Sequence, residues 1–158
     1  MAINKIITSR RLELGLSDAE VAERAGILIM EYYDIEHYDD EFATAVEIHN
    51  ARLLCKVLGL NFCQIAMDII ASDQQATAQI IDDSISSAYI GMTRDKIISS
   101  RRHKLSLSEQ ELADAIGFEV RTICAIENDE NFLECWSIDL VISLARELKL
   151  PPLLLLRC

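Results

Sequence analysis

The sequence has little of what β-sheets, membrane spans and disulfide scaffolds need. Aromatic residues make up 6% of the 158 residues, and there are only five Gly and two Pro. Because aromatic residues favour strands while Gly and Pro break helices, this composition favours an all-α fold. No apolar run approaches 18 residues, and no basic segment precedes an apolar stretch at the N-terminus. We therefore expect a soluble, cytoplasmic protein without a membrane span.

The five cysteines are spaced without a recognisable metal-binding or redox pattern. They are Cys55, Cys63, Cys124, Cys135 and Cys158. An odd number at spacings that match neither a zinc site nor a redox pair indicates reduced thiols. We expect the first four to act as small buried hydrophobic residues and Cys158 to be exposed.

No group of residues specifies catalysis. His37, His49 and His103 are isolated, and no nearby pattern of Cys, Ser or Asp indicates a nucleophile or a metal site. We therefore expect a protein that is not an enzyme and that needs no cofactor or metal ion.

The chain carries a net charge of −11, from 26 acidic and 15 basic side chains. A DNA duplex is densely negative, and affinity for it comes largely from Lys and Arg side chains that neutralise phosphates. Residues 1–70 contribute −6, residues 71–93 contribute −3 and residues 94–158 contribute −2. The charge therefore disfavours DNA as a partner, most strongly for the first part of the chain.

The stretch SEQELADAIGFEVRTICAIE, which begins at Ser108, reads as a helix, a tight turn and a second helix. Ser108 and Glu111 have the spacing of a capping box, which marks the start of a helix. Apolar residues at helical spacing follow, and Gly117 stands where a residue with positive φ can end the helix. Ile123 and Ile126 then mark the buried side of the second helix.

The same pattern occurs earlier in the chain, because residues 5–26 align without a gap with residues 96–117. The two stretches read KIITSRRLELGLSDAEVAERAG and KIISSRRHKLSLSEQELADAIG. This tandem duplication predicts two domains, residues 1–70 and 94–158. Residues 71–93 between them have apolar residues at helical spacing, which predicts a connecting helix of about four turns. We expect it to pack between the domains, because it has apolar side chains that need cover, namely Ile80, Ile81, Ile85, Tyr89 and Ile90.

Five helices are expected in each domain. In the first they cover residues 3–13, 18–25, 29–36, 46–58 and 62–70, and in the second 94–104, 109–116, 120–127, 137–148 and 152–156. Pro152 suits the first turn of the last helix, where a missing N–H costs little.

This arrangement resembles the five-helix DNA-binding domain of phage repressors and Cro proteins, the Xre type of the helix-turn-helix family. The resemblance rests on the capping box, the turn glycine, the pair Ile126 and Glu127, and a closing Leu-Lys-Leu at residues 148–150. The first repeat has matching features, with Ile35 and Glu36 as its pair and a closing Leu-Gly-Leu at residues 58–60. The resemblance implies two tandem helix-turn-helix domains, so that one chain mimics the dimer that other family members form.

In this family an arginine of the first helix pairs with the glutamate that closes the third. Arg11 and Glu36 match these positions in the first repeat, and Arg102 and Glu127 match them in the second at the same separation. The duplicated spacing favours a structural ion pair within each domain. Loss of one partner would leave a partly buried charge unpaired.

Family members that bind DNA read bases with side chains in the first turns of the third helix, which lies in the major groove. The matching positions of the two repeats are Ile29, Met30, Glu31 and Asp34, and Val120, Arg121, Thr122 and Ala125. Base edges favour donors such as Arg, and only the second set provides one. DNA binding would therefore rely on Arg121 and Thr122, supported by a basic patch. Its cations would be Arg94, Lys96, Arg101 and Lys104.

The positions that grip phosphates in the family are acidic in this chain. Many relatives have a glutamine directly after the cap of the second helix, where this sequence has Asp18 and Glu109. The family often has a basic loop after the third helix, whereas the segments here read HYDDEF and NDENFLE. Carboxylates repel phosphates, so both repeats depart from the DNA-binding pattern.

The surface of the first repeat that would face DNA is instead apolar and acidic. Its members are Leu28, Ile29, Met30, Tyr33 and Tyr38, with the carboxylates of Glu31, Asp34, Asp39 and Asp40. Tyr and Met among charged residues are typical of protein-binding surfaces. The alternative is that Tyr32 and some of these apolar residues serve the core or cover the connecting helix.

We therefore expect a regulatory protein that acts mainly by contact with a basic protein partner, as an antitoxin, an immunity protein or a transcription-factor antagonist does. The alternative is a DNA-binding transcriptional regulator that reads DNA mainly through the second repeat. Homodimerisation stays open, because residues 153–156 would leave an apolar patch if the last helix lacked cover.

Overall fold

Helices form every regular element in the computed structural model, which describes residues 2–72 and 87–158. The α-helices of the first half (residues 2–72) are α1 (Ile3–Glu13), α2 (Asp18–Ala25), α3 (Ile29–His37), α4 (Glu41–Thr44), α5 (Ile48–Leu58) and α6 (Phe62–Ser72). The second half (residues 87–158) has α8 (Arg94–Lys104), α9 (Glu109–Ile116), α10 (Val120–Ile126), the 3₁₀ helix η2 (Phe132–Cys135), α11 (Ile138–Glu147) and α12 (Pro152–Leu156). The predicted all-α fold class is confirmed. None of the described helices is long and apolar enough to cross a membrane.

Side-chain caps and a left-handed glycine set the bounds of α2 and α9. Ser17 Oγ accepts the amide of Glu20 at 3.3 Å, and Glu20 Oε2 accepts the amide of Ser17 at 2.9 Å. Ser108 and Glu111 form the same pair of bonds in α9, at 3.1 and 2.7 Å. Gly26 ends α2 with φ of 72°, a conformation in which a Cβ would be strained. The glycine that ends α9 has the same conformation.

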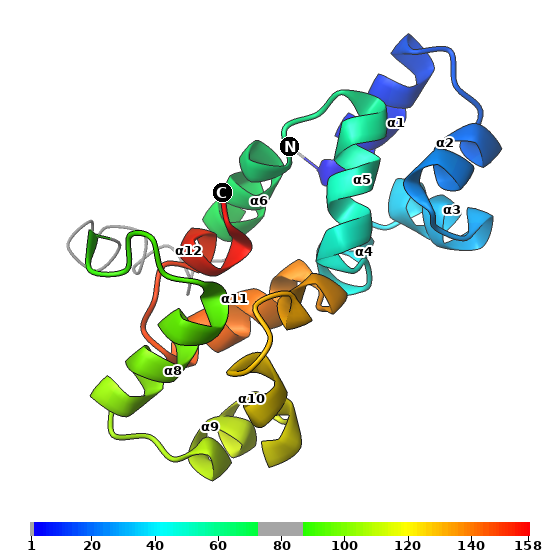
Figure 1. Cartoon of the computed structure of the whole chain (residues 1–158). Helices are drawn as coiled ribbons and strands as arrows, with labels where there is room; N and C mark the ends of the chain where they lie inside the picture. Colours follow the sequence, from blue (N-terminus) through cyan, green and yellow to red (C-terminus); the bar gives the residue numbers. More distant parts are fainter. Residues whose placement is uncertain (1, 73–86) are drawn as a thin grey trace.

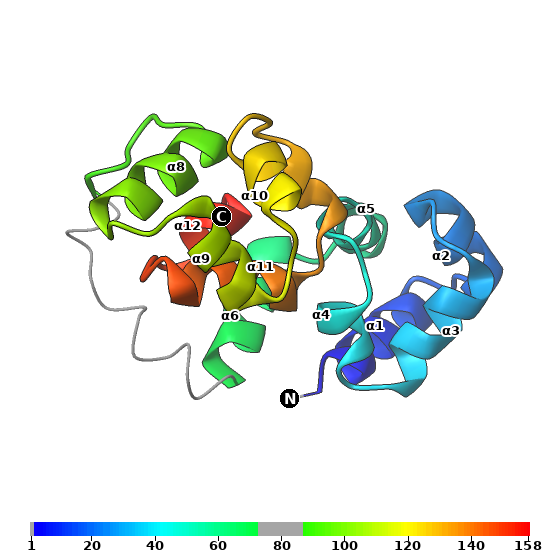
Figure 2. The same ribbon diagram turned by 90° about the horizontal axis from the view of Figure 1, so that it is seen from below.

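The order of helices in the first half recurs in the second. α1 and α8 each have 11 residues, α2 and α9 each have eight, and each half continues with a third helix, a short helical turn and a longer helix. Figures 1 and 2 show α1 to α3 at one end of the molecule and α8 to α10 at the other, with α5 and α11 between them. The third helices of the two halves therefore lie far apart.

The two halves meet along a seam in which equivalent elements pair with each other. α5 packs on η2 and α11 packs on α4, while α6 packs on α12. At the centre of the seam, Glu47 and Ser137 form an isolated antiparallel bridge, and the amide of Ile48 donates to the carbonyl of Trp136 at 2.8 Å. Glu47 directly precedes α5 and Ser137 directly precedes α11, the equivalent helix of the second half, so the seam is approximately two-fold symmetric.

The last helix is covered, because Leu155 and Leu156 are fully buried where α12 packs on α6. Leu153 and Leu154 also pack against the core. The apolar patch that residues 153–156 would otherwise leave is therefore largely absent.

Short helical turns follow the third helices, where the sequence predicted only loops. Phe42 in α4 and Leu133 in η2 are each 1% exposed, and their burial holds the two turns against the longer helices. A four-residue turn has no periodic pattern, which explains why it was not predicted. α6 also continues to Ser72, two residues beyond the predicted end of the first domain.

Most of the predicted connecting helix lies outside the described residues, since residues 73–86 are not described. At its end, Tyr89 is buried as expected, whereas Ile90 is 82% exposed. The expectation that both side chains are covered is therefore wrong for Ile90.

Candidate functional site

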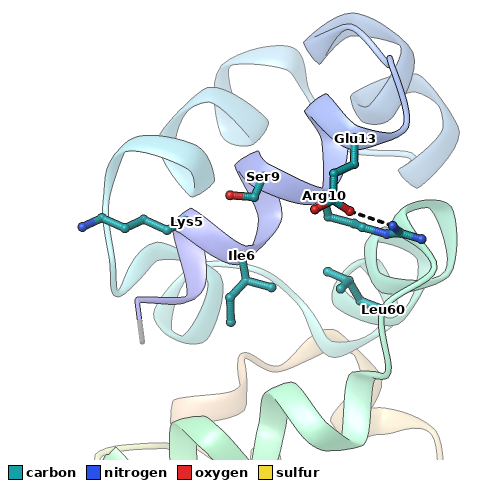
Figure 3. Close-up of a pocket in the computed structure, with 6 residues that line it drawn as sticks. All are labelled: Lys5, Ile6, Ser9, Arg10, Glu13 and Leu60. Carbon is teal, nitrogen blue, oxygen red and sulfur yellow. Dashed lines mark hydrogen bonds and ion pairs between the residues drawn. The ribbon is translucent and has the colours of Figure 1, made fainter.

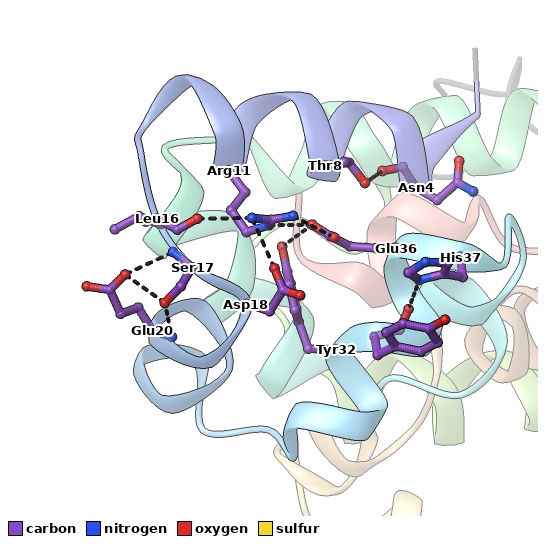
Figure 4. Close-up of polar contacts among 11 residues, drawn as sticks. Asn4, Thr8, Arg11, Leu16, Ser17, Asp18, Glu20, Tyr32, Glu36 and His37 are labelled. Atoms are coloured by element: carbon purple, nitrogen blue, oxygen red, sulfur yellow. Dashed lines mark hydrogen bonds and ion pairs between the residues drawn. The ribbon is translucent and has the colours of Figure 1, made fainter.

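A partly buried ion pair joins α1 to α3 in the first half. Arg11 Nε donates to Glu36 Oε1 at 2.7 Å and Arg11 Nη2 donates to Glu36 Oε2 at 3.0 Å (Figure 4). The hydroxyl of Tyr32 donates to the same carboxylate at 2.7 Å. Burial alone would raise the pKa of Glu36, but the hydrogen bonds from Arg11 and Tyr32 outweigh it and lower that pKa. Tyr32 is fully buried, so it serves the core and not a binding surface.

The equivalent pair in the second half is also bidentate. Arg102 donates to both carboxylate oxygens of Glu127, at 2.6 and 2.8 Å, and both side chains are 7% exposed. The hydrogen bond to Glu127 raises the pKa of Arg102. Asp18 and Glu109 match positions that contact phosphates in the resembled family. In this structure a carboxylate oxygen of Asp18 lies 3.0 Å from Arg11 Nη1, and one of Glu109 lies 3.7 Å from Arg102 Nη2. Their carboxylates thus belong to the internal ion-pair clusters.

The predicted apolar and acidic surface of the first half, here called the α3 face, is exposed. Its apolar members are Leu28 (76% exposed), Ile29 (52%), Met30 (67%), Tyr33 (46%) and Tyr38 (56%). The inward positions of α3 are taken by Tyr32 and Ile35 instead. These five exposed apolar side chains all lie within residues 28–38, which distinguishes them from single scattered ones.

The carboxylates of the α3 face differ in their exposure and in their hydrogen bonds. Glu31 is half-buried and accepts the amide of Leu28 at 3.4 Å, so it also caps α3. Asp34 is half-buried, whereas Asp39 and Asp40 are exposed after the end of the helix. No Lys or Arg occurs from residue 27 to residue 51. This segment therefore adds only negative charge to the field at the α3 face.

His37 belongs to the α3 face although the sequence analysis treated it as isolated. Its ring stacks on Tyr33 with centroids 3.8 Å apart, and its Nδ1 lies 2.7 Å from the Tyr33 carbonyl oxygen. The spacing of four residues on a helix was the signal that could have identified this pair. The stack restricts the conformations open to the Tyr33 ring.

The equivalent surface of the second half is polar and short of free cations. Arg121, at the position equivalent to Met30, is 83% exposed but lies 2.6 Å from Glu119. Thr122 is half-buried, and Cys124, at the position of Tyr33, donates to Glu109 at 3.1 Å. The two third helices therefore present different chemistry from equivalent positions.

The remaining cations of the predicted basic patch are held by groups of the protein itself. Arg94 is 2% exposed and pairs with Glu134 at 2.5 Å, so its assignment to a surface patch is wrong. Arg101 donates to the carbonyls at the end of α11, at 2.8 and 3.1 Å. Lys104 lies 4.9 Å from the centre of the Tyr89 ring, and Lys96 lies 3.3 Å from Asp95. Arg94 is therefore excluded from the predicted basic patch, whereas Lys96 and Lys104 are exposed and Arg101 is partly buried.

A groove of about 360 Å³ runs along the outer side of α1 (Figure 3). It is lined by Lys5, Ile6, Ser9, Arg10, Glu13 and Leu60. Arg10 is engaged, because its Nε donates to the Leu58 carbonyl at 2.9 Å and its Nη1 donates to Glu13 at 2.8 Å. No His or Cys lies in this groove to activate the hydroxyl of Ser9.

All five cysteines are free thiols. Cys55 is buried, Cys63 and Cys124 are partly buried, and Cys158 is exposed as expected. Cys135 is also exposed, contrary to prediction, because η2 turns its last side chain towards solvent. Within residues 2–72 and 87–158, no group of three or more His, Cys, Asp or Glu side chains could hold a metal ion.

A comparison of the chain with protein-family models, with curated proteins and with solved structures finds no match.

Proposed function

We propose that the chain is a tandem pair of repressor-like helix-turn-helix domains. The recurring helix order, the two capping boxes with their turn glycines, and the two bidentate Arg–Glu pairs support this architecture. The seam supports it as well, because it pairs equivalent elements as a two-fold dimer interface does. One chain would thus hold two domains in the arrangement of a dimer.

We further propose that the protein is a non-enzymatic regulator that binds a basic protein through the α3 face. The observation that carries this proposal is the exposure of five apolar side chains on and next to α3, in a segment, residues 27–51, that has no Lys or Arg. Such a surface gains nothing from counterion release on DNA. Its carboxylates would steer a cationic partner, and its aromatic and aliphatic groups would supply most of the affinity after contact.

Antitoxins, immunity proteins and transcription-factor antagonists are the functional classes that fit this mode of action. Each neutralises another protein by covering a surface that the target needs. A target that binds nucleic acid carries a basic surface, and that surface complements the charge of the α3 face.

The test is affinity capture from an extract of the native cell with matched variants of the full chain. Met30→Ala with Tyr33→Ala removes the centre of the α3 face, while Arg121→Ala with Cys124→Ala changes the equivalent positions of the second half. A basic protein retained by the wild type and by the second variant should be lost from the first. Retention of that protein by all three would show that the α3 face is not the binding surface.

Charge reversal separates steering from contact. Asp39→Lys with Asp40→Lys should mainly slow association with the captured partner and weaken its salt dependence, because exposed charges act on the encounter. Tyr33→Ala should mainly speed dissociation, because it removes buried contact area.

The alternative is a DNA-binding regulator, favoured by the exposure of Arg121 in the first turn of α10. Arg121→Ala should then lose about 1 to 3 kcal/mol on a specific site. An equal loss of DNA affinity in Met30→Ala would show that the first half contains the base-reading surface. The nucleic acid retained in the capture experiment decides whether this alternative applies.

A further inference from the structure

A groove of about 310 Å³ lies at the seam, next to the α3 face, and is here called the seam groove. Ile3, Ile69 and Ile142 supply apolar walls, and Asp39, Asp40 and Asp139 supply carboxylates. Asp139 and Ile142 come from α11 of the second half, so both halves form the groove. Within the described part of the chain, no cation lies within ion-pair distance of these three carboxylates.

The approximate two-fold relation of the seam identifies an equivalent place on its other side. Ile3 and Arg94 are the first residues of α1 and α8, and Ala43 and Glu134 are the third residues of α4 and η2. Likewise, Arg52 and Ile142 are the fifth residues of α5 and α11. Three positions that line the seam groove thus have charged equivalents across the seam.

Those equivalents fill their side of the seam with an internal cluster. Glu134 accepts from Arg94 at 2.5 Å and from Arg52 at 3.4 Å. Both arginines also donate to carbonyls at the end of α12, those of Leu155 and Leu156. On the side of the seam groove, Ile3, Ala43 and Ile142 replace these long charged side chains, and the space remains open.

Asp39, at the rim of the groove, has an equivalent residue in the second half that binds a guanidinium of the chain itself. Asp39 stands two residues before α4, and Glu130 stands two residues before η2. Glu130 accepts from Arg157 Nη2 at 2.6 Å. The position equivalent to Arg157 is Met67 in α6, which cannot donate to Asp39 as Arg157 does to Glu130.

We propose that the seam groove receives an arginine or lysine side chain of a protein partner. The aliphatic stem would lie on the isoleucine walls and the cationic head would meet Asp39, Asp40 and Asp139. Arginine fits best, because its planar guanidinium is weakly hydrated and bonds two carboxylates at once. This inference rests on the proposed function, since Asp39 and Asp40 belong to both the α3 face and the groove.

A partner held in this way contacts both halves of the chain. It would therefore hold α11 against α4 and favour the closed seam over the separated halves. The affinity for the partner would therefore depend on Asp139 and Ile142 of the second half, although that half lies outside the α3 face.

The probe is a fluorescently labelled tetra-arginine peptide, titrated onto the full chain and followed by fluorescence anisotropy. Ala43→Met fills the groove without a change of charge, and Ala115→Met places the same side chain on the exposed side of α9 as its control. Asp139→Asn removes one carboxylate, and Glu147→Gln makes the same charge change later in α11. Circular dichroism shows whether each variant folds, and Asp139→Asn decides if Ala43→Met does not fold.

Ala43→Met and Asp139→Asn should each weaken peptide binding about ten-fold. Ala43→Met does so because it occupies the space for the side-chain stem, and Asp139→Asn because it weakens one charge-assisted hydrogen bond. The two controls should change it less than about two-fold. Equal losses in variants and controls, or no binding to the wild type, would overturn the proposal. Failure of the Met30 and Tyr33 variants to release the captured partner would refute the proposed function and leave the peptide result standing.

Discussion

Removal of the buried carboxylate of Glu127 should destabilise the protein strongly. In Glu127→Gln the guanidinium of Arg102 keeps its bond to the Leu107 carbonyl at 2.9 Å and its weaker contact with Glu109 at 3.7 Å. It loses the carboxylate that now meets it at 2.6 and 2.8 Å. An uncompensated charge that is 7% exposed carries most of the desolvation penalty of a buried ion.

The expected loss is about 3 kcal/mol, the lower end for a broken buried pair, because glutamine still accepts one hydrogen bond. For a chain of this size it corresponds to a fall in Tm of about 6 to 12 °C. Urea unfolding followed by circular dichroism measures the free energy directly. The control is Glu13→Gln. Glu13 forms an exposed ion pair with Arg10, and its loss should lower the free energy of unfolding by only about 0.5 kcal/mol.

A double variant, Arg102→Met with Glu127→Met, tests the cause. It removes both charges from the site, so it should recover most of the stability that Glu127→Gln loses. If Glu127→Gln is no less stable than Glu13→Gln, the pair is not a buried structural element and the reasoning is wrong. If the double variant is as unstable as the single one, packing and not charge explains the loss.

Three further effects on stability are expected. Burial raises the pKa of Cys55 to about 12, so the stability that its neutral thiol contributes is complete below pH 9 and is lost as pH rises from 9 to 12. Urea titrations over that range should show a smaller loss of unfolding free energy in Cys55→Ala than in the wild type. Gly26→Ala should cost about 1 kcal/mol by the same assay, because φ of 72° strains a Cβ even where space is open. Ser108→Ala should also cost about 1 kcal/mol through the lost cap of α9, and a loss below the error of the measurement would contradict the capping role.

Local signals predicted much of the fold. α2 and α9 begin and end at the predicted residues, because a capping box and a left-handed glycine act within one turn of the backbone. α4 and η2 were missed because each depends on one buried side chain, Phe42 or Leu133, whose burial comes from helices distant in sequence. Exposure of Ile90 likewise depends on packing that periodicity does not reveal.

The candidate site was predictable only where it lies on one helix. The register of α3 turns Tyr32 and Ile35 inwards, and this leaves Met30 and Tyr33 exposed as the spacing predicted. The burial of Arg94 was not predictable, because its partner Glu134 lies 40 residues away. The seam groove depends on α11 packing against α4, and no pattern within either segment indicates that contact.

The most direct test of a protein-binding α3 face is site-specific photo-cross-linking in the native cell. A photoreactive phenylalanine analogue would replace Met30 in one variant of the full chain and Arg121 in another, two exposed and equivalent positions. We expect a cross-link to a basic protein from position 30, and its loss when Asp39→Lys and Asp40→Lys are added. A cross-link to DNA from position 121, with no protein cross-link from position 30, would contradict the proposed function.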